Sequence, residues 1–203
     1  MIYASIDIET TGDDPALHQI LQIGVAIEDT ANLRPLSELP TLKINIDPGV
    51  IVGTPGALAM NQAILEEIDN SRKRLTTNTW VVSLQQAMKN VESFLRLNGA
   101  LPPKPGGTPY LTCLGKNFGT FDLQFLKNAG DSIFTKARVY VIDPGQFCID
   151  WASDINPPSM PSCFRRCGIT HEVSHDALQD ALDCIEIMRQ CTNGYTTTLH
   201  PIR

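Results

Sequence analysis

The sequence contains no run of 18 or more apolar residues, so no segment is predicted to span a membrane. Its first residues combine neither a basic region nor a long apolar stretch, which argues against a signal peptide and predicts a cytoplasmic location. Internal repeats and low-complexity tracts are absent as well. These absences leave an ordinary globular protein, and 203 residues with 42% apolar side chains are enough for one domain, residues 1–203, with a substantial core.

Basic residues are fewer than acidic ones, 16 against 22, and the formal net charge is −6. This balance argues against binding of long duplex nucleic acid through bulk electrostatic attraction. It does not exclude a nuclease, because metal ions bound at an active site would neutralise several acidic side chains.

The six cysteines show no paired framework, and a cytoplasmic chain would keep them reduced. Cys163, Cys167, His171 and His175 recur every four residues, which invites a zinc site. However, Gly168-Ile169-Thr170 interrupts a continuous helix, and the spacing lacks the long central gap of common zinc motifs. We therefore predict that Cys163 and Cys167 are packing residues.

Five segments are predicted to be strands, since they are short, apolar or β-branched, and bounded by turn residues. They are residues 2–9, 20–27, 42–46, 110–114 and 139–142. The short connections between the first three favour an antiparallel arrangement.

Apolar residues at three/four spacing, with proline, glycine and capping residues at the ends, predict the helices. They are residues 55–68, 79–97, 121–129, 162–167 and 177–190, with loops at 98–109 and 144–161. This order predicts an α/β fold in which a five-stranded mixed sheet, its first three strands antiparallel, is flanked by helices on both faces.

Two acidic residues lie side by side on the first predicted strand. Asp7 and Glu9 are two positions apart, so their side chains point to one face, while Ile6 and Ile8 point to the other. Two neighbouring carboxylates on a central strand are costly unless they are paired, and a bound metal removes that cost. The spacing alone is also typical of solvated acids at an exposed strand end.

A third carboxylate, Asp122, lies where the predicted helix at 121–129 begins. There it could serve as a helix cap or as a metal ligand. Asn117, five positions earlier, could fix the preceding loop through side-chain hydrogen bonds.

The last acidic residue of the pattern comes with a histidine. His175 and Asp180 are five apart, so on one regular helix they would point about 140° away from each other. They converge only if His175 lies on the loop before the helix and Asp180 on its first turns. Ser174 or Asp176 is then expected to cap the helix, and Asp183 to lie on its solvated face.

Four carboxylates from three distant segments suit two hard divalent cations, Mg²⁺ or Mn²⁺. Two such ions about 3.5–4 Å apart clamp a phosphodiester during hydrolysis. A histidine beside them can take a proton from the attacking water near neutral pH.

Taken in order, the segments at 7–12, 117–122 and 175–181 resemble the three motifs of the DEDDh (DnaQ-like) 3′→5′ exonucleases. The matching residues are Asp7-Ile8-Glu9-Thr10-Thr11-Gly12, then Asn117 with Phe121-Asp122, then His175-Asp176-Ala177-Leu178 with Asp180-Ala181. That group includes polymerase proofreading subunits, RNase T and oligoribonuclease. The motifs run across nearly the whole chain.

The resemblance implies a ribonuclease H-like fold. It also implies that Asp7, Glu9, Asp122 and Asp180 are metal ligands for two Mg²⁺ or Mn²⁺ ions and that His175 is the general base. By the same match, Thr10 and Asn117 are candidate substrate contacts. Lys116 stands where many members have histidine, and Asn61 lies near a position where some members carry a substrate-contacting histidine.

The implied activity is release of nucleoside 5′-monophosphates from the 3′ ends of single-stranded DNA or RNA. An RNA-specific enzyme that trims short RNAs, like RNase T or oligoribonuclease, is one alternative, and a non-catalytic nucleic-acid-binding subunit is another. The sequence does not distinguish DNA from RNA, because a 2′-hydroxyl contact is a single hydrogen bond. A chain of this size could act alone, form a homodimer or associate with a polymerase.

Overall fold

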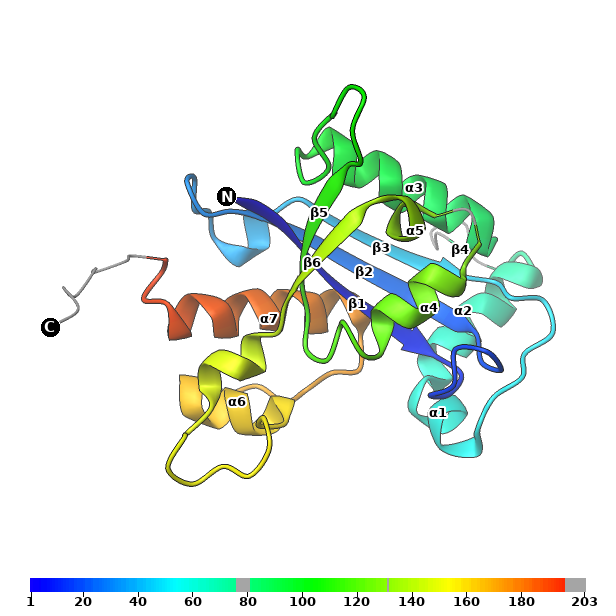
Figure 1. Cartoon of the computed structure of the whole chain (residues 1–203). Helices are drawn as coiled ribbons and strands as arrows, with labels where there is room; N and C mark the ends of the chain where they lie inside the picture. The colour runs from blue at the N-terminus through cyan, green and yellow to red at the C-terminus, as the bar shows by residue number, and fades with distance from the viewer. Residues whose placement is uncertain (76–80, 131, 196–203) are drawn as a thin grey trace, which may run out of the picture.

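The structure is a computed structural model that describes residues 1–75, 81–130 and 132–195. It contains a six-stranded mixed sheet in the order β4-β3-β2-β1-β5-β6, with helices on both faces (Figure 1). None of the helices in these ranges is long and apolar enough to cross a membrane. The α/β class and the flanking helices predicted from the sequence are confirmed.

The N-terminal strand lies at the centre of the sheet. β1 (Ile2–Thr10) pairs antiparallel with β2 (Ile20–Asp29), which pairs antiparallel with β3 (Thr41–Ile46). On the other side of β1, β5 (Tyr110–Leu114) and β6 (Arg138–Ile142) continue the sheet in parallel. The predicted antiparallel arrangement of the first three strands is confirmed.

The prediction of five strands is wrong by one. β4 (Val81–Val82) pairs in parallel with the end of β3, within a segment whose spacing predicted a helix over 79–97. The helix α3 (Leu84–Leu97) begins only after Ser83, whose side chain accepts a hydrogen bond from the Gln86 amide. Two β-branched residues beside an open strand edge favour pairing over one more helical turn. Residues 79 and 80 lie outside the described ranges.

A second predicted helix is divided in two. Residues 55–68 were predicted as one helix, but α1 (Pro55–Met60) and α2 (Gln62–Arg72) meet at Asn61. Thr54 caps α1 by accepting a hydrogen bond from the Ala57 amide. The break places the Asn61 side chain in the interior, where it is buried.

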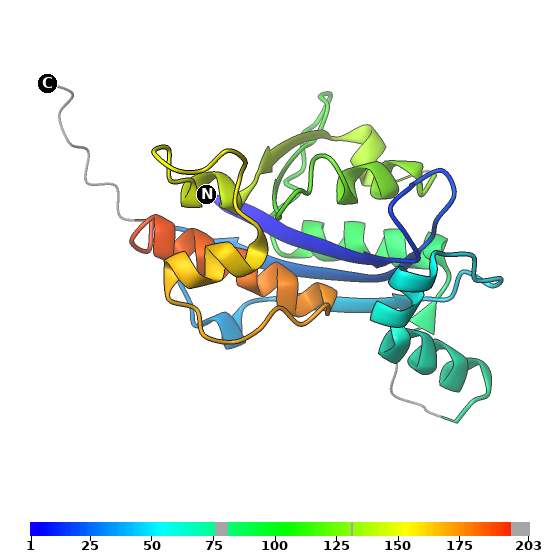
Figure 2. The ribbon, with the colours of Figure 1, turned by 90° about the horizontal axis from the view of Figure 1, so that it is seen from below.

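The remaining helices form two layers. On one face, α3, α4 (Asp122–Asn128) and α5 (Ile133–Lys136) bury the even-numbered apolar side chains of β1. On the other face, α7 (Ala177–Cys191) packs against Tyr3, and Figure 2 shows α6 (Met160–Cys167) beside it on that side of the sheet.

Short elements complete the fold. The 3₁₀ helices η1 (Leu36–Glu38) and η2 (Pro144–Cys148) lie in connecting segments, the second within the stretch predicted as a loop. Gly168 ends α6 with a left-handed φ of 72°, as expected for a glycine directly after a helix.

Candidate active site

Asp7 and Glu9 face the α7 side of the sheet, and Ile6 and Ile8 face the opposite core, as the alternation predicted. Glu9 is buried, whereas Asp7 remains partly exposed toward the pocket described below. Both carboxylates lie near the C-terminal end of the central strand. The strand therefore presents two acids to the start of α7.

The start of α7 brings a third acid and the histidine to this place. Asp176 caps the helix by accepting hydrogen bonds from the amides of Leu178 and Gln179, so the cap prediction is confirmed. Asp180 lies in the first turn and is buried, while His175 lies on the preceding loop with a left-handed φ of 53°. This is the arrangement that convergence of the two side chains requires.

The three side chains meet across the gap between strand and helix. One ligand atom each from Glu9, His175 and Asp180 can be chosen so that all lie within 4.8 Å of one another. Ser174 donates a hydrogen bond of 3.3 Å to Asp180, which holds the loop against the helix. Two carboxylates and an imidazole at this separation form a possible cation site.

Gly24 permits this close approach, and the sequence analysis did not single it out. It lies opposite Asp7 in β2, and a Cβ atom at this position would be 2.2 Å from the carbonyl carbon of Ala177. The Ala177 amide donates a hydrogen bond of 2.9 Å to Gln22 on the same strand. In the sequence, Gly24 is a lone glycine inside an apolar strand, and such a glycine often marks a close approach of another backbone segment.

Gly24→Ala is expected to lower the melting temperature by about 5–10 °C and to displace the start of α7 from β1. The added methyl group overlaps backbone atoms, and overpacking of this kind costs about 1–3 kcal/mol. Thermal unfolding measures the effect. Gly56→Ala on α1 is the matched control, because its Cβ atom would meet open space and alanine favours a helix. Equal melting temperatures for the two variants would contradict the close packing.

Asp122 reaches the site from α4, which lies on the face of the sheet opposite to α7. It is the first residue of α4, the cap position being Phe121, and its Oδ1 accepts a hydrogen bond of 3.0 Å from the Ile8 amide. The side chain is buried. The carboxylate is therefore fixed directly to the strand that carries Asp7 and Glu9, and the capping alternative does not apply.

Asp7, Glu9 and Asp180 border a pocket of about 440 Å³, whose lining does not include Asp122. Thr10 lines it and donates a hydrogen bond of 2.7 Å to the Gly12 carbonyl. Asn61 reaches it from the break between α1 and α2, and its amide nitrogen donates to the Thr10 carbonyl at 3.0 Å. The complete lining is Asp7, Ile8, Glu9, Thr10, Gly12, Asp13, Thr54, Ala57, Met60, Asn61, Phe121, His175 and Asp180.

Asn117 does not belong to this lining. It is exposed, with a left-handed φ of 59°, and its carbonyl accepts hydrogen bonds from the Thr120 and Phe121 amides. Its side chain accepts a hydrogen bond of 2.8 Å from Lys116. The residue shapes the loop before α4, and its contact with a substrate stays a prediction.

The expectation that Asp183 lies on the solvated face of α7 is wrong. It is fully buried, and its Oδ1 accepts a hydrogen bond of 2.7 Å from Gln179 and lies 3.0 Å from His171 Nε2. The segment between α6 and α7 covers this part of the helix, which the helical periodicity of α7 alone does not reveal. Oδ2 of Asp183 has no hydrogen-bond partner among the described residues.

Burial and mutual repulsion raise the pKa of the carboxylates. Burial raises the pKa of Glu9 to about 7, and the charge of Asp180 adds to the rise. Burial likewise raises the pKa of Asp180 to about 6, with the charge of Asp183 as the second cause.

The pKa values of Asp122 and Asp7 are raised as well. Burial raises the pKa of Asp122 to about 8, and the pKa of Asp7 is raised well above its ordinary value by burial and then by the charges of Asp122, Asp180 and Glu9. No lysine or arginine is among the described residues that line the pocket. A set of buried acids without a cationic side chain is a donor set that fits divalent cations.

The chain is similar to known proteins in its fold. No family model and no curated protein matches the chain. Among solved structures, the chain shares the α/β fold of exonuclease I.

The zinc-bound E. coli exonuclease I–ssDNA complex matches with a TM-score of 0.68, and E. coli exonuclease I with a 5cy-dA13 oligonucleotide with 0.64. A further structure of exonuclease I gives a TM-score of 0.66. Each match has 16% sequence identity and covers 95% of this chain but 40% of the other. The chain thus spans less than half the length of these relatives.

Proposed function

We propose that this chain is a metal-dependent 3′→5′ exonuclease that releases nucleoside 5′-monophosphates from single-stranded ends. The observation that carries the proposal is the convergence of Glu9, Asp180 and His175 around one pocket, on a fold shared with exonuclease I. Because those structures include complexes with single-stranded DNA and an oligonucleotide, we take single-stranded DNA as the first substrate class to test.

Asp7, Glu9, Asp122 and Asp180 would hold two divalent cations, Mg²⁺ or Mn²⁺. Bound cations would neutralise charge on the scissile phosphate and acidify the attacking water. The raised pKa values of the four acids support this role, because a bound cation relieves the repulsion among them.

His175 would take the proton from the attacking water. It is exposed to solvent at the mouth of the pocket, so the proton has a path to bulk water. Its position on the loop, outside the regular turns of α7, lets the imidazole lie beside Asp180 rather than on another side of the helix. Ser174 holds the same loop to Asp180.

The other residues that line the pocket would hold the terminal nucleotide. Thr10 and Asn61 supply polar atoms there, and Oδ1 of Asn61 is buried with no hydrogen-bond partner among the described residues. Met60, Ala57 and Phe121 supply apolar surface on which a base can pack. Phe118, in contrast, is completely buried in the core.

The test uses a 5′-labelled single-stranded DNA 12-mer and its RNA counterpart, each with Mg²⁺, Mn²⁺ or EDTA. We expect a ladder that shortens from the 3′ end, requires the cation and releases 5′-monophosphates. The faster of the two substrates identifies the preferred sugar and decides between a general and an RNA-specific enzyme. Binding of both strands without cleavage, by a folded chain with either cation, would indicate a binding subunit instead.

A further inference from the structure

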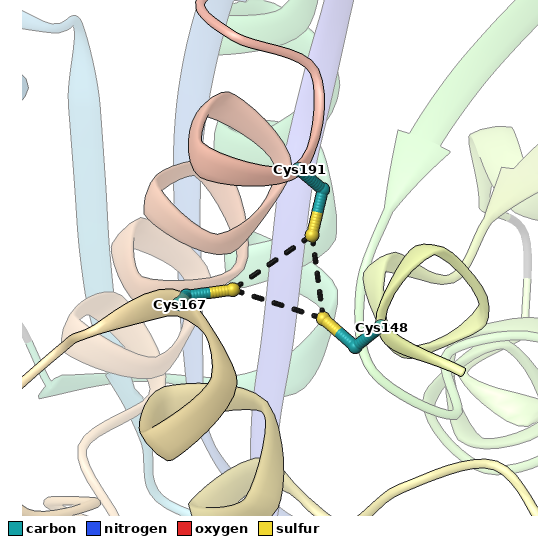
Figure 3. A group of neighbouring side chains, drawn as sticks. All are labelled: Cys148, Cys167 and Cys191. Atoms are coloured by element: carbon teal, nitrogen blue, oxygen red, sulfur yellow. Dashed lines mark hydrogen bonds between the residues drawn. The ribbon is translucent and has the colours of Figure 1, made fainter. Parts of the chain in front are cut away.

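Three cysteines from distant parts of the chain meet on the α7 side of the fold. Cys148 is the last residue of η2, Cys167 the last of α6 and Cys191 the last of α7. Their sulfur atoms face one another, as Figure 3 shows, and all three are free thiols. The Sγ–Sγ distances are 3.3 Å between Cys148 and Cys191, 3.7 Å between Cys167 and Cys191, and 3.8 Å between Cys148 and Cys167.

This cluster is not the zinc quartet that the sequence spacing invited. His175 groups with Glu9 and Asp180, and His171 groups with Asp183, so neither histidine joins Cys167 in a candidate metal group of the described residues. Cys163 is completely buried among apolar side chains, as predicted for a packing residue. Cys167 is only partly buried and turns toward the other two thiols.

The separations of the three sulfurs match a tetrahedral metal site. Zinc binds thiolate sulfur at about 2.3 Å, and two corners of such a tetrahedron are about 3.8 Å apart. The sulfurs of Cys148, Cys167 and Cys191 differ from that spacing by no more than about 0.5 Å. Small side-chain rotations are enough to bring them to three corners around one ion.

The surroundings leave room for a fourth ligand and favour a cation. The three cysteines line a pocket of about 320 Å³, together with Phe147, Ile149, Asp150, Arg166 and Gln190. The C-terminal ends of α6 and α7 meet there, and helix C-termini carry partial negative charge that stabilises a cation. Arg166 donates a hydrogen bond of 2.6 Å to the Cys148 carbonyl and another of 2.7 Å to the Asp154 carboxylate, so it fixes the end of η2 to α6.

We propose that Cys148, Cys167 and Cys191 bind one Zn²⁺ as thiolates, with the fourth coordination position facing the pocket and taken by water. The ion joins the ends of η2, α6 and α7. Cys191 is 11 residues beyond Asp180 on α7, about 16 Å along the helix, so this site is separate from the carboxylates.

Zinc uptake replaces three S–H bonds with three Zn–S bonds and releases three protons. Burial raises the pKa of both Cys148 and Cys167, the latter to about 11, so these two thiols are protonated in the metal-free chain. Metal binding must displace these protons, and the affinity therefore falls as the pH is lowered.

The test begins with the reduced, unmodified chain and Co²⁺ as a spectroscopic substitute for Zn²⁺. Thiolate-bound Co²⁺ gives a sulfur-to-metal charge-transfer band in the near ultraviolet and strong visible bands in tetrahedral geometry, whereas carboxylate-bound Co²⁺ gives no sulfur band. We expect both signals at one equivalent of Co²⁺ and their loss on addition of one equivalent of Zn²⁺. A reduced chain that gives no sulfur band overturns the site, as does a freshly purified chain that titrates two thiols short because a disulfide has formed.

Variants then assign the ligands. Cys191→Ser and Cys148→Ser are expected to weaken zinc binding by on the order of 10²-fold or more. Cys163→Ala, a neighbouring buried cysteine on α6, is the matched control and should keep one zinc per chain. If Cys163→Ala loses zinc as completely as Cys191→Ser, the three-thiolate assignment is wrong.

Discussion

Asp7→Asn is expected to lower the rate of 3′-end hydrolysis by on the order of 10³-fold or more, about 4 kcal/mol of transition-state stabilisation. Asp7 lies on the central strand and lines the pocket with Glu9 and Asp180; burial, followed by the charges of Asp122, Asp180 and Glu9, raises its pKa. The amide keeps the shape of the carboxylate but removes its charge. Steady-state cleavage of the labelled 12-mer at saturating Mn²⁺ measures the loss.

Asp7→Asn is also expected to change how the melting temperature depends on pH and on a bound cation. Glu9 and Asp122 have a pKa of about 7 and 8 in the metal-free fold, above their ordinary values, so the folded chain holds more protons than the unfolded chain. The contribution of these two acids to metal-free stability is therefore greatest below their ordinary pKa values and is lost as the pH rises toward 8. A cation at about 100 times its Kd should raise the parent's melting temperature by about 5–10 °C at pH 8 and much less at pH 5.

In Asp7→Asn we expect a higher metal-free melting temperature than in the parent at pH 8, and almost no response to the cation. Asp69→Asn is the matched control. It removes the same charge from the surface of α2, where Asp69 pairs with exposed Lys73, and should behave like the parent. A full cation response in Asp7→Asn would remove Asp7 from the set of metal ligands.

His175→Ala is expected to reduce hydrolysis by roughly 10²- to 10⁴-fold, the usual contribution of a general base. The exposed loop position means that the truncation removes little packing, so the fold should be retained. Added imidazole should restore part of the rate, because a free base can enter the open mouth of the pocket. Single-turnover cleavage with and without imidazole measures both effects.

The cation response separates a base from a ligand at this position. One atom of His175 groups with Glu9 and Asp180 within 4.8 Å, so the side chain could in principle bind a metal itself. If it is the base, His175→Ala keeps the parent's cation-dependent rise in melting temperature while losing activity. Loss of both would assign His175 as a ligand, and a rate within a few-fold of the parent would exclude it from the chemistry.

Features fixed by local periodicity were predictable. The alternation along β1 placed Asp7 and Glu9 on one face, and the five-residue separation of His175 and Asp180 required a loop followed by a helix start. Both arguments rest on strand and helix geometry alone. The order of the motifs added the remaining acid, Asp122, which the structure ties to Ile8.

Features fixed by distant contacts were not predictable in the same way. The pairing of β4 depends on the open edge of β3, and the burial of Asp183 depends on the segment that precedes α7. Cys148 and Cys191 are 43 residues apart along the chain. They meet because η2, α6 and α7 end at the same place in the fold. Such contacts follow from tertiary packing, which overrides local propensity.

The central position of β1 has a consequence for biosynthesis. β1 is synthesised before its neighbour β5, which begins at residue 110, and before the helix that carries Asp180, which begins at residue 177. Contacts over such long sequence separations form late, because the intervening chain must be present before the loop can close. A nascent chain therefore has no complete set of carboxylates until Asp180 has been synthesised and α7 can pack against β1.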